Sequence, residues 1–244
     1  MKNGKSNKKI MGIAAGLLVA GIAAACMFYI NDYYHSEEAV DAYLNGTEQV
    51  KVLELKNGLL LDSEGDEKAL IFYPGAKVEY TAYVPLFMEL AEQGLDCFMV
   101  KMPCNLANLG MNEAEKIMEE YEGEYEEWYL AGHSLGGAMA ASFAAEHQET
   151  LDGLILLAAY STKSFESEEF RVLSIYGSED TVLNREKLEE GRALMPEDYK
   201  EFVIEGGNHA QFGYYGIQEG DGEAVISREE QIRQTVEVMV DFVG

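Results

Sequence analysis

The sequence predicts one α/β domain, with strands and helices alternating around a mostly parallel sheet that helices cover on both faces. The chain has 244 residues, of which 48% are hydrophobic, so it can bury one sizeable core. A two-strand hairpin pattern comes first. Short apolar runs then alternate with segments of helical periodicity, which is typical of a parallel sheet with helical crossovers.

Each element follows from a local pattern. Asn57-Gly58 is a two-residue turn signal between the apolar residues 51–55 and 59–61, which predicts the hairpin. Ser227 and Glu230 form a capping box that opens the last helix. Further strands are expected at residues 69–73, 95–102, 128–131, 151–159, 171–176 and 199–204. Helices are expected at residues 80–93, 113–121, 136–147, 185–194 and 229–243.

The stretch at residues 161–170 is where a lid could be inserted between two strands. Ten residues cannot build a helical cap, so we expect a minimal lid or none.

The N-terminus has the pattern of a membrane anchor. Residues 10–30 are uncharged and apolar, and four lysines precede them. The expected organisation is a basic cytoplasmic segment at residues 1–9, a transmembrane signal anchor at 10–30, a juxtamembrane spacer at 31–50 and a catalytic domain at 51–244. Within the spacer, residues 36–44 are expected to form a short helix with Ser36 as its N-cap.

The lysines place the N-terminus inside and the domain outside the cell membrane by the positive-inside rule. Two alternatives remain: cleavage after the small residues Ala23, Ala24 and Ala25, giving a secreted protein, or lipid attachment at Cys26. The apolar run is long for a cleaved signal peptide, which favours the uncleaved anchor with the lipid bilayer as its partner.

The charge of the chain argues against one class of partner. Removing the four lysines of the first 30 residues changes the formal charge from −26 to −30. Such an acidic surface repels phosphate backbones, so we expect no nucleic-acid partner. Three cysteines make no disulfide framework, and we expect no cofactor and no metal.

A candidate nucleophile lies in the motif Gly132-His133-Ser134-Leu135-Gly136, which fits G-x-S-x-G. The motif follows an apolar strand at residues 128–131 and opens a helix of small residues. In that setting the serine occupies a strained turn and its hydroxyl is exposed. Ser134 is therefore the predicted nucleophile.

A serine needs a base to take its proton, and His209 is the best placed of the four histidines. It follows the strand at residues 199–204, at the edge where open α/β sheets build their sites. Between Ser134 and His209, Asp180 follows a strand in the order Ser, Asp, His, and it would orient the base. Glu179 is the alternative, since a turn is easily misplaced by one residue.

The oxyanion of an acyl-transfer reaction needs two N–H donors. Leu135, which follows the nucleophile, supplies one. The other is expected in the turn at residues 73–77, where Pro74 has no N–H. Ala76 is the prediction, with Lys77 as the alternative.

Residues 70–244 resemble the α/β-hydrolase superfamily and, within it, a small lidless group of membrane-anchored bacterial proteins. The resemblance is carried by the blocks YPGAKVEYTAYVPL, VKMPCNLANLG, AGHSLGG, YGSEDTVLN and GGNHAQFGYYGIQEGDGEAVISREEQ. It implies an α/β-hydrolase fold and the triad Ser134, Asp180 and His209.

The expected activity is that of a carboxylesterase-like serine hydrolase, which cleaves ester-like bonds of small-molecule substrates through an acyl-enzyme. The alternatives are a peptidase, thioesterase or acyltransferase with the same triad, or a non-catalytic binding module at the cell surface.

Overall fold

The computed structural model describes residues 16–22, 24, 26–65, 67–167 and 169–244. The chain divides into two compact units, Met1–Tyr33 and Tyr34–Gly244. In the first unit the described residues up to Asn31 are helical. Part of the predicted anchor, residues 10–15, 23 and 25, lies outside the described residues. Among those described, no helix has both the length and the apolar character needed to cross a membrane.

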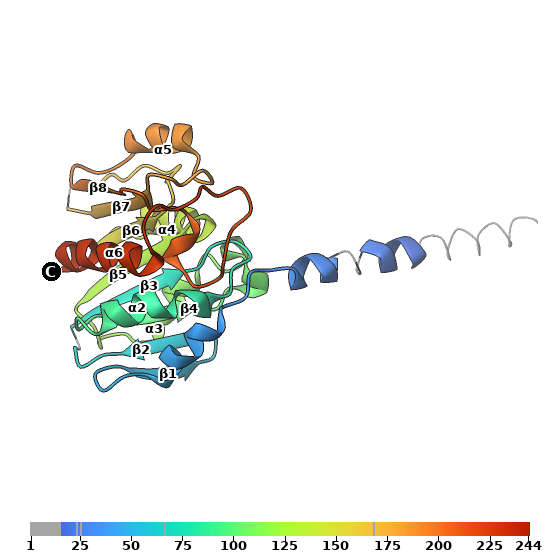
Figure 1. Cartoon of the computed structure of the whole chain (residues 1–244). Coiled ribbons are helices and arrows are strands. Elements are labelled where there is room, and N and C mark those ends of the chain that lie inside the picture. The colour runs from blue at the N-terminus through green and yellow to red at the C-terminus, as the bar shows by residue number, and fades with distance from the viewer. Residues whose placement is uncertain (1–15, 23, 25, 66, 168) are drawn as a thin grey trace, which may run out of the picture. The chain divides into compact units, whose positions relative to one another are not determined.

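The second unit is built on one eight-stranded sheet with the order β1-β2-β4-β3-β5-β6-β7-β8 (Figure 1). The strands are β1 (Lys51–Leu55), β2 (Gly58–Asp62), β3 (Lys68–Tyr73), β4 (Asp96–Val100), β5 (Glu127–His133), β6 (Gly153–Leu157), β7 (Arg171–Gly177) and β8 (Tyr199–Ile204). β2 pairs antiparallel with β1 and β4, and the pairings from β4 to β8 are parallel. The predicted mostly parallel sheet is confirmed.

Helices cover both faces of this sheet. They are α2 (Val84–Ala91), α3 (Glu113–Glu120), α4 (Leu135–Glu146), α5 (Arg185–Arg192) and α6 (Arg228–Val243). Short 3-10 turns are η1 (Glu38–Asn45), η2 (Tyr80–Tyr83), η3 (Pro103–Asn105), η4 (Ala107–Leu109) and η5 (Ala210–Phe212). α2 and α6 pack on one face, while α3 and α4 pack on the other.

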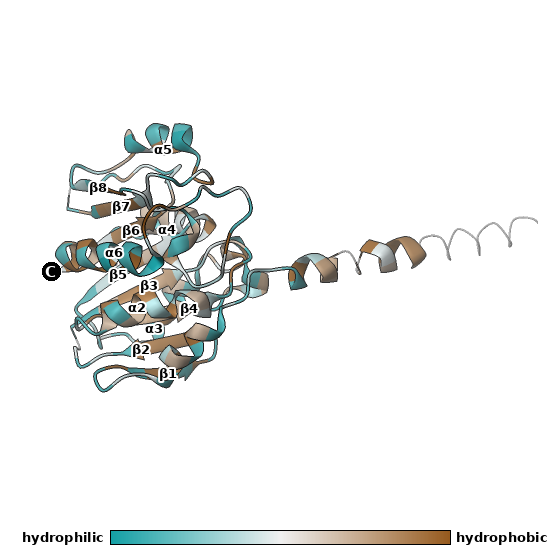
Figure 2. Ribbon diagram, viewed as in Figure 1, coloured by the Kyte–Doolittle hydropathy of each residue, from teal (hydrophilic) through white to brown (hydrophobic). Residues whose placement is uncertain are grey.

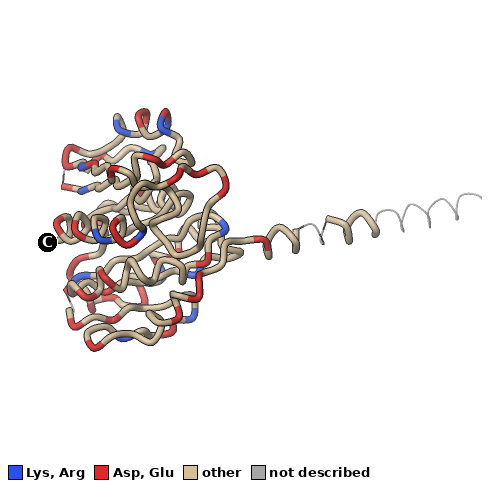
Figure 3. The backbone as a smooth tube through the Cα atoms, viewed as in Figure 1, with Lys and Arg blue, Asp and Glu red and all other residues tan. Residues whose placement is uncertain are grey.

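The two cores follow from the two-residue period of a strand. In β3, Leu70 and Phe72 belong to the core beneath α2 and α6, while Ile71 and Tyr73 belong to the core beneath α3 and α4. Figure 2 shows the apolar strands inside the unit and hydrophilic residues on the outer sides of its helices. Asp and Glu residues are distributed along much of the chain of this unit (Figure 3).

Several predicted boundaries shift. The expected strands at residues 95–102 and 151–159 are shorter than predicted. The expected helix at residues 80–93 is divided into η2 and α2, because Pro85 lies in the first turn of α2. The described residues between β6 and β7 form no helix, so no helical lid is built there.

Two local predictions were wrong. The hairpin turn consists of Lys56 and Asn57, one residue earlier than expected, because Leu55 pairs with Gly58. Ser36 does not cap η1, whose N-cap is Glu37 without a side-chain hydrogen bond. The Ser36 backbone N–H instead donates to the Glu79 carboxylate at 3.0 Å, a tertiary partner that a local pattern cannot reveal.

The predicted spacer at residues 31–50 is, from Tyr34 onward, part of the second compact unit. Val40 and Val50 are buried in its core. The second unit therefore includes most of the segment predicted as a spacer.

Candidate active site

Ser134 occupies the sharp turn between β5 and α4. Its backbone has φ 53° and ψ −121°, a conformation that costs a residue other than glycine on the order of 1–3 kcal/mol. The turn is held by a hydrogen bond from the Ser134 N–H to the Leu157 carbonyl oxygen at 2.9 Å. This strained turn is the one expected for the nucleophile of the G-x-S-x-G motif.

The glycines of the motif are required by close contacts between backbones. A Cβ at Gly136 would lie 2.2 Å from the carbonyl oxygen of Tyr73, and one at Gly132 would lie 2.5 Å from the Gly136 carbonyl carbon. Any side chain at either position would separate α4 from the strands. The absence of side chains thus lets the helix N-terminus approach the end of β3.

His209 and Asp180 are brought together from the loops after β8 and β7. The Nδ1 atom of His209 lies 2.8 Å from Oδ2 of Asp180, and both side chains are buried. The other carboxylate oxygen of Asp180 accepts hydrogen bonds from the N–H groups of Val182 and Leu183, at 2.9 and 2.8 Å. A carboxylate can only accept, so Nδ1 of His209 carries the proton and Nε2 presents its lone pair.

Glu179, the alternative to Asp180, has a different environment. Its carboxylate accepts a hydrogen bond from the hydroxyl of Ser178 at 2.9 Å. The structure therefore pairs His209 with Asp180 and not with its neighbour.

Ser134 and His209 line one cavity of about 240 Å³. The Nε2 atom of His209 is buried and has no hydrogen-bond partner among the described residues, so the Ser134 hydroxyl is not hydrogen-bonded to it. Such contacts are often long in a free enzyme and tighten when substrate binds. The other lining residues are Leu135, Ala138, Ala158, Ala159, Tyr160, Val182, Leu183 and Asn184.

The turn after β3 lies against the N-terminus of α4, since a Cβ at Gly136 would meet the Pro74 carbonyl oxygen at 2.4 Å. The Gly75 N–H donates to the Tyr83 hydroxyl and the Lys77 N–H donates to the Asn105 carbonyl. For the Ala76 N–H, the structure gives no acceptor among the described residues. Because the Lys77 N–H already has an acceptor, Ala76 is the better candidate for an oxyanion donor beside Leu135.

The family described as "Alpha/beta hydrolase family" matches residues 69–233 of the chain. The chain belongs to the alpha/beta hydrolase family.

Solved structures with the same fold share little sequence with this hydrolase. TT1662 from Thermus thermophilus is 14% identical, with 79% of this chain and 98% of that chain covered and a TM-score of 0.57. A monoacylglycerol lipase from Paleococcus ferrophilus is 16% identical, with coverages of 72% and 96% and a TM-score of 0.57. The alpha/beta hydrolase GrgF from Penicillium sp. sh18 is 11% identical, with coverages of 79% and 97% and a TM-score of 0.60. No curated protein matches the chain.

Side chains after His209 hold the histidine loop of this hydrolase through hydrogen bonds, a role that the sequence did not suggest. The Asp221 carboxylate accepts hydrogen bonds from the N–H groups of His209 and Ala210, at 3.2 and 2.9 Å. The Gln231 side chain both accepts from the Asn208 N–H and donates to the Asn208 carbonyl oxygen. The backbone on both sides of His209 is therefore fixed by side chains 11 to 23 residues away.

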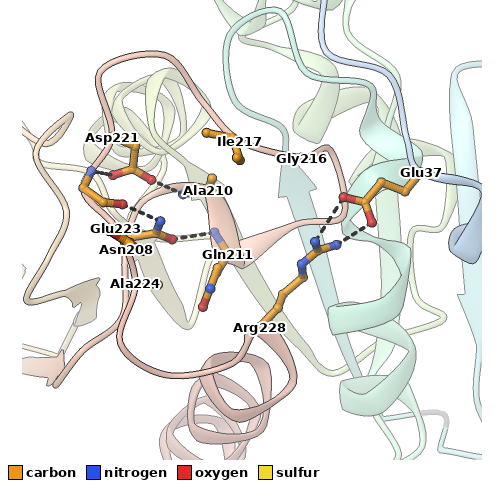
Figure 4. A pocket seen from close by; sticks show the side chains of 11 residues that line it. Glu37, Asn208, Ala210, Gln211, Gly216, Ile217, Asp221, Glu223, Ala224 and Arg228 are labelled. Atoms are coloured by element: carbon orange, nitrogen blue, oxygen red, sulfur yellow. Dashed lines mark hydrogen bonds and ion pairs between the residues drawn. The ribbon is translucent and has the colours of Figure 1, made fainter.

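A second cavity, of about 570 Å³, is lined by residues of this loop and of the segment that follows it (Figure 4). Asn208, Ala210 and Asp221 line it, whereas His209 lines the smaller cavity with Ser134. Among the described residues, no group of three or more His, Cys, Asp or Glu side chains could hold a metal ion.

Proposed function

We propose that this hydrolase is a serine esterase that transfers the acyl group of a small ester-like substrate to water. The observation that carries the proposal is that His209, which is hydrogen-bonded to Asp180 through Nδ1 and has an unpartnered Nε2 atom, lines the same cavity as Ser134. The proposed nucleophile and base thus line one small cavity, and the group that orients the base is bonded to the histidine from behind.

The reaction begins when the Ser134 hydroxyl attacks the substrate carbonyl and His209 Nε2 takes its proton. The carboxylate of Asp180 stabilises the resulting imidazolium. The N–H groups of Leu135 and Ala76 stabilise the oxyanion, an effect worth a few kcal/mol in such sites. His209 then protonates the leaving group, and the acyl-enzyme is hydrolysed by a water molecule that His209 activates.

The size of the cavity supports a small acyl group. Its volume of about 240 Å³ is below the roughly 300–1,000 Å³ of sites that hold drug-sized ligands. A peptidase, a thioesterase or an acyltransferase would use the same triad, and a panel of esters, thioesters and amides distinguishes them.

Labelling with a fluorophosphonate tests the serine. We expect the wild-type protein to be labelled and Ser134→Ala to remain unlabelled while it keeps its fold. Ser142→Ala is a matched control that should be labelled like the wild type, because the half-buried Ser142 hydroxyl donates to the Ala138 carbonyl oxygen within α4. Equal labelling of the wild type and Ser134→Ala would refute the assignment, and no labelling of either would favour a non-catalytic binding module.

We further propose that residues 10–30 anchor the protein in the cell membrane and that the hydrolase unit lies on the outer side. The four lysines before the apolar run support this orientation. Leu17, Leu18 and Phe28 are exposed in the first unit, as expected of side chains that face lipid.

A further inference from the structure

The first residues of the hydrolase unit are hydrogen-bonded to a turn beside the candidate active site. The Tyr34 N–H donates to the Lys77 carbonyl oxygen at 2.7 Å, and the Tyr34 carbonyl oxygen accepts from the Glu79 N–H at 2.9 Å. These bonds form a parallel bridge between Tyr34 and Val78. Val78 follows the proposed oxyanion donor Ala76 by two residues, so the chain enters the unit at the active-site edge of the sheet.

A second loop holds the same segment. The Glu37 N–H donates to the Tyr214 carbonyl oxygen at 2.8 Å, and the Glu37 carboxylate forms a two-bond ion pair with Arg228 at 2.8 and 3.0 Å (Figure 4). The Glu219 N–H donates to the Tyr34 hydroxyl at 3.2 Å. Residues 34–37 are therefore held by hydrogen bonds to the turn after β3 and to the segment after His209.

Apolar side chains are exposed on loops of this edge. Residues 74–79, 101–112 and 205–226 follow the carboxyl ends of β3, β4 and β8, and together they form the site rim. The exposed fractions are 56% for Leu109, 93% for Ile217 and 80% for Val225, all on the rim. The other large apolar side chain exposed in the described part of this unit is Leu53, on β1, at 42%.

We propose that the site rim rests on the outer surface of the lipid bilayer and that the substrate is a short-acyl ester held at that surface. The inference rests on the proposed anchor and on the proposed hydrolase activity. Tyr34 follows Ile30 by four residues. Only residues 31–33 therefore separate the proposed anchor from the segment that is bonded beside the site.

The charges on the rim indicate which lipid headgroups it can approach. Glu79, Glu205, Glu219, Asp221 and Glu223 outnumber Lys77 and Lys101 on the rim, so the rim is acidic overall. These carboxylates disfavour anionic headgroups, so the surface that fits is a zwitterionic one such as phosphatidylcholine. Exposed Ile217 and Val225 would then lie among the headgroups, as apolar residues of interfacial proteins do.

Quenching by lipids tests this orientation on the full chain. A Cys26→Ser variant keeps Cys104, exposed on the rim, as a site for a fluorescent label, while burial raises the pKa of the Cys97 thiol and protects it. A matched control carries Cys26→Ser, Cys104→Ser and Glu124→Cys, with the label before β5 at the opposite edge of the sheet. Both are inserted into phosphatidylcholine vesicles that contain a phosphatidylcholine with a spin label on its headgroup.

We expect the label on Cys104 to be quenched severalfold more strongly than the label at position 124. Equal quenching, or stronger quenching at position 124, would overturn the proposal about the rim and leave the anchor intact. A chain that does not float with the vesicles would overturn the anchor and the rim together. Fluorophosphonate labelling of the same samples reports on Ser134 separately.

A second test compares Ile217→Glu with Leu53→Glu, which adds the same charge to the exposed leucine of β1. We expect Ile217→Glu to lower kcat/KM roughly fivefold for a fluorogenic acetate ester attached to a phospholipid, and to leave hydrolysis of soluble p-nitrophenyl acetate unchanged. Leu53→Glu should change neither rate. An equal loss on both esters, or no loss on either, would overturn a membrane role for Ile217.

Discussion

The Nε2 atom of His133 lies 3.1 Å from the backbone carbonyl oxygen of His209. A carbonyl can only accept, so Nε2 carries the proton and the other ring nitrogen, Nδ1, accepts from the Tyr83 hydroxyl at 2.8 Å. Tyr83 in turn accepts from the Gly75 N–H at 3.3 Å. One buried chain of hydrogen bonds thus joins the loop of the proposed base to the turn of the proposed oxyanion donor.

This environment makes the stability of the hydrolase depend on pH. Burial lowers the pKa of His133 well below its usual 6.5, so the folded protein keeps it neutral while the unfolded chain binds a proton below pH 6.5. The contribution of His133 to the free energy of unfolding is therefore fully present above pH 6.5. It is lost as pH falls, by up to about 1.4 kcal/mol per pH unit.

Urea denaturation at pH 5, 6 and 7.5 measures this loss. We expect the stability difference between the wild type and His133→Gln to shrink as pH falls, because glutamine does not titrate. His147→Gln, at the C-terminal end of α4, is the control. A difference that stays constant from pH 7.5 to pH 5 would contradict the prediction.

Tyr83→Phe should lower kcat and leave KM nearly unchanged. The variant removes the acceptor of the Gly75 N–H and the donor to His133, so the neighbouring Ala76 N–H is no longer held in place. Loss or misplacement of one oxyanion donor lowers kcat on the order of 10²-fold, and we expect about tenfold from this indirect effect.

Tyr73→Phe is the matched control, because the buried Tyr73 hydroxyl donates to Met111 and accepts from Ala114, away from the cavity. Similar losses of kcat in both variants would mean that Tyr83 acts only through general stability. Steady-state kinetics with p-nitrophenyl acetate distinguishes the two results.

Asp180→Asn should reduce kcat on the order of 10³–10⁴-fold. Asparagine can donate to Nδ1 of His209 and so favours the tautomer in which Nε2 carries the proton and cannot accept one. Glu179→Gln should change kcat only a few-fold, since its carboxylate contacts Ser178. A larger loss of kcat in Glu179→Gln than in Asp180→Asn would mean that Glu179, and not Asp180, orients His209.

Periodic patterns predicted the order of strands and helices in the hydrolase unit, because burial on a sheet or a helix repeats along the chain. The pairing of Asp180 with His209 was also foreseen, since both follow parallel strands that end at one edge. The roles of Ser36 and Asp221 were not predicted. Each depends on a partner in another loop, Glu79 and His209 respectively, and neither pairing leaves a local pattern.

His133 was visible in the motif but its role was not. Its partners come from η2 and from the loop after β8, 50 and 76 residues away along the chain. A sequence alone cannot show that these two elements meet at the end of β5.

Proteolysis of intact cells tests the proposed orientation of the anchor. With the lysines on the inner side, a protease added outside cells or spheroplasts should digest the hydrolase unit. A cytoplasmic protein in the same sample should remain intact. Protection of the unit until the cells are lysed would place it in the cytoplasm.

The acyl preference of the hydrolase should be set by Leu183, which lines the cavity shared by Ser134 and His209. We expect kcat/KM for p-nitrophenyl esters to be highest at two to four carbons, because the cavity of about 240 Å³ leaves longer chains in solvent. Each methylene that the cavity buries is worth about 0.8 kcal/mol, and each one beyond it adds little.

Leu183→Ala should move the optimum toward longer chains, since it removes a wall of the cavity without touching the Leu183 N–H that holds Asp180. Leu188→Ala is the matched control: Leu188 is buried in the same small cluster but does not line the cavity. Both variants lose a similar core contact, so stability should fall alike in the two. Only Leu183→Ala should change the chain-length profile, and an unchanged profile would mean that the acyl group binds elsewhere.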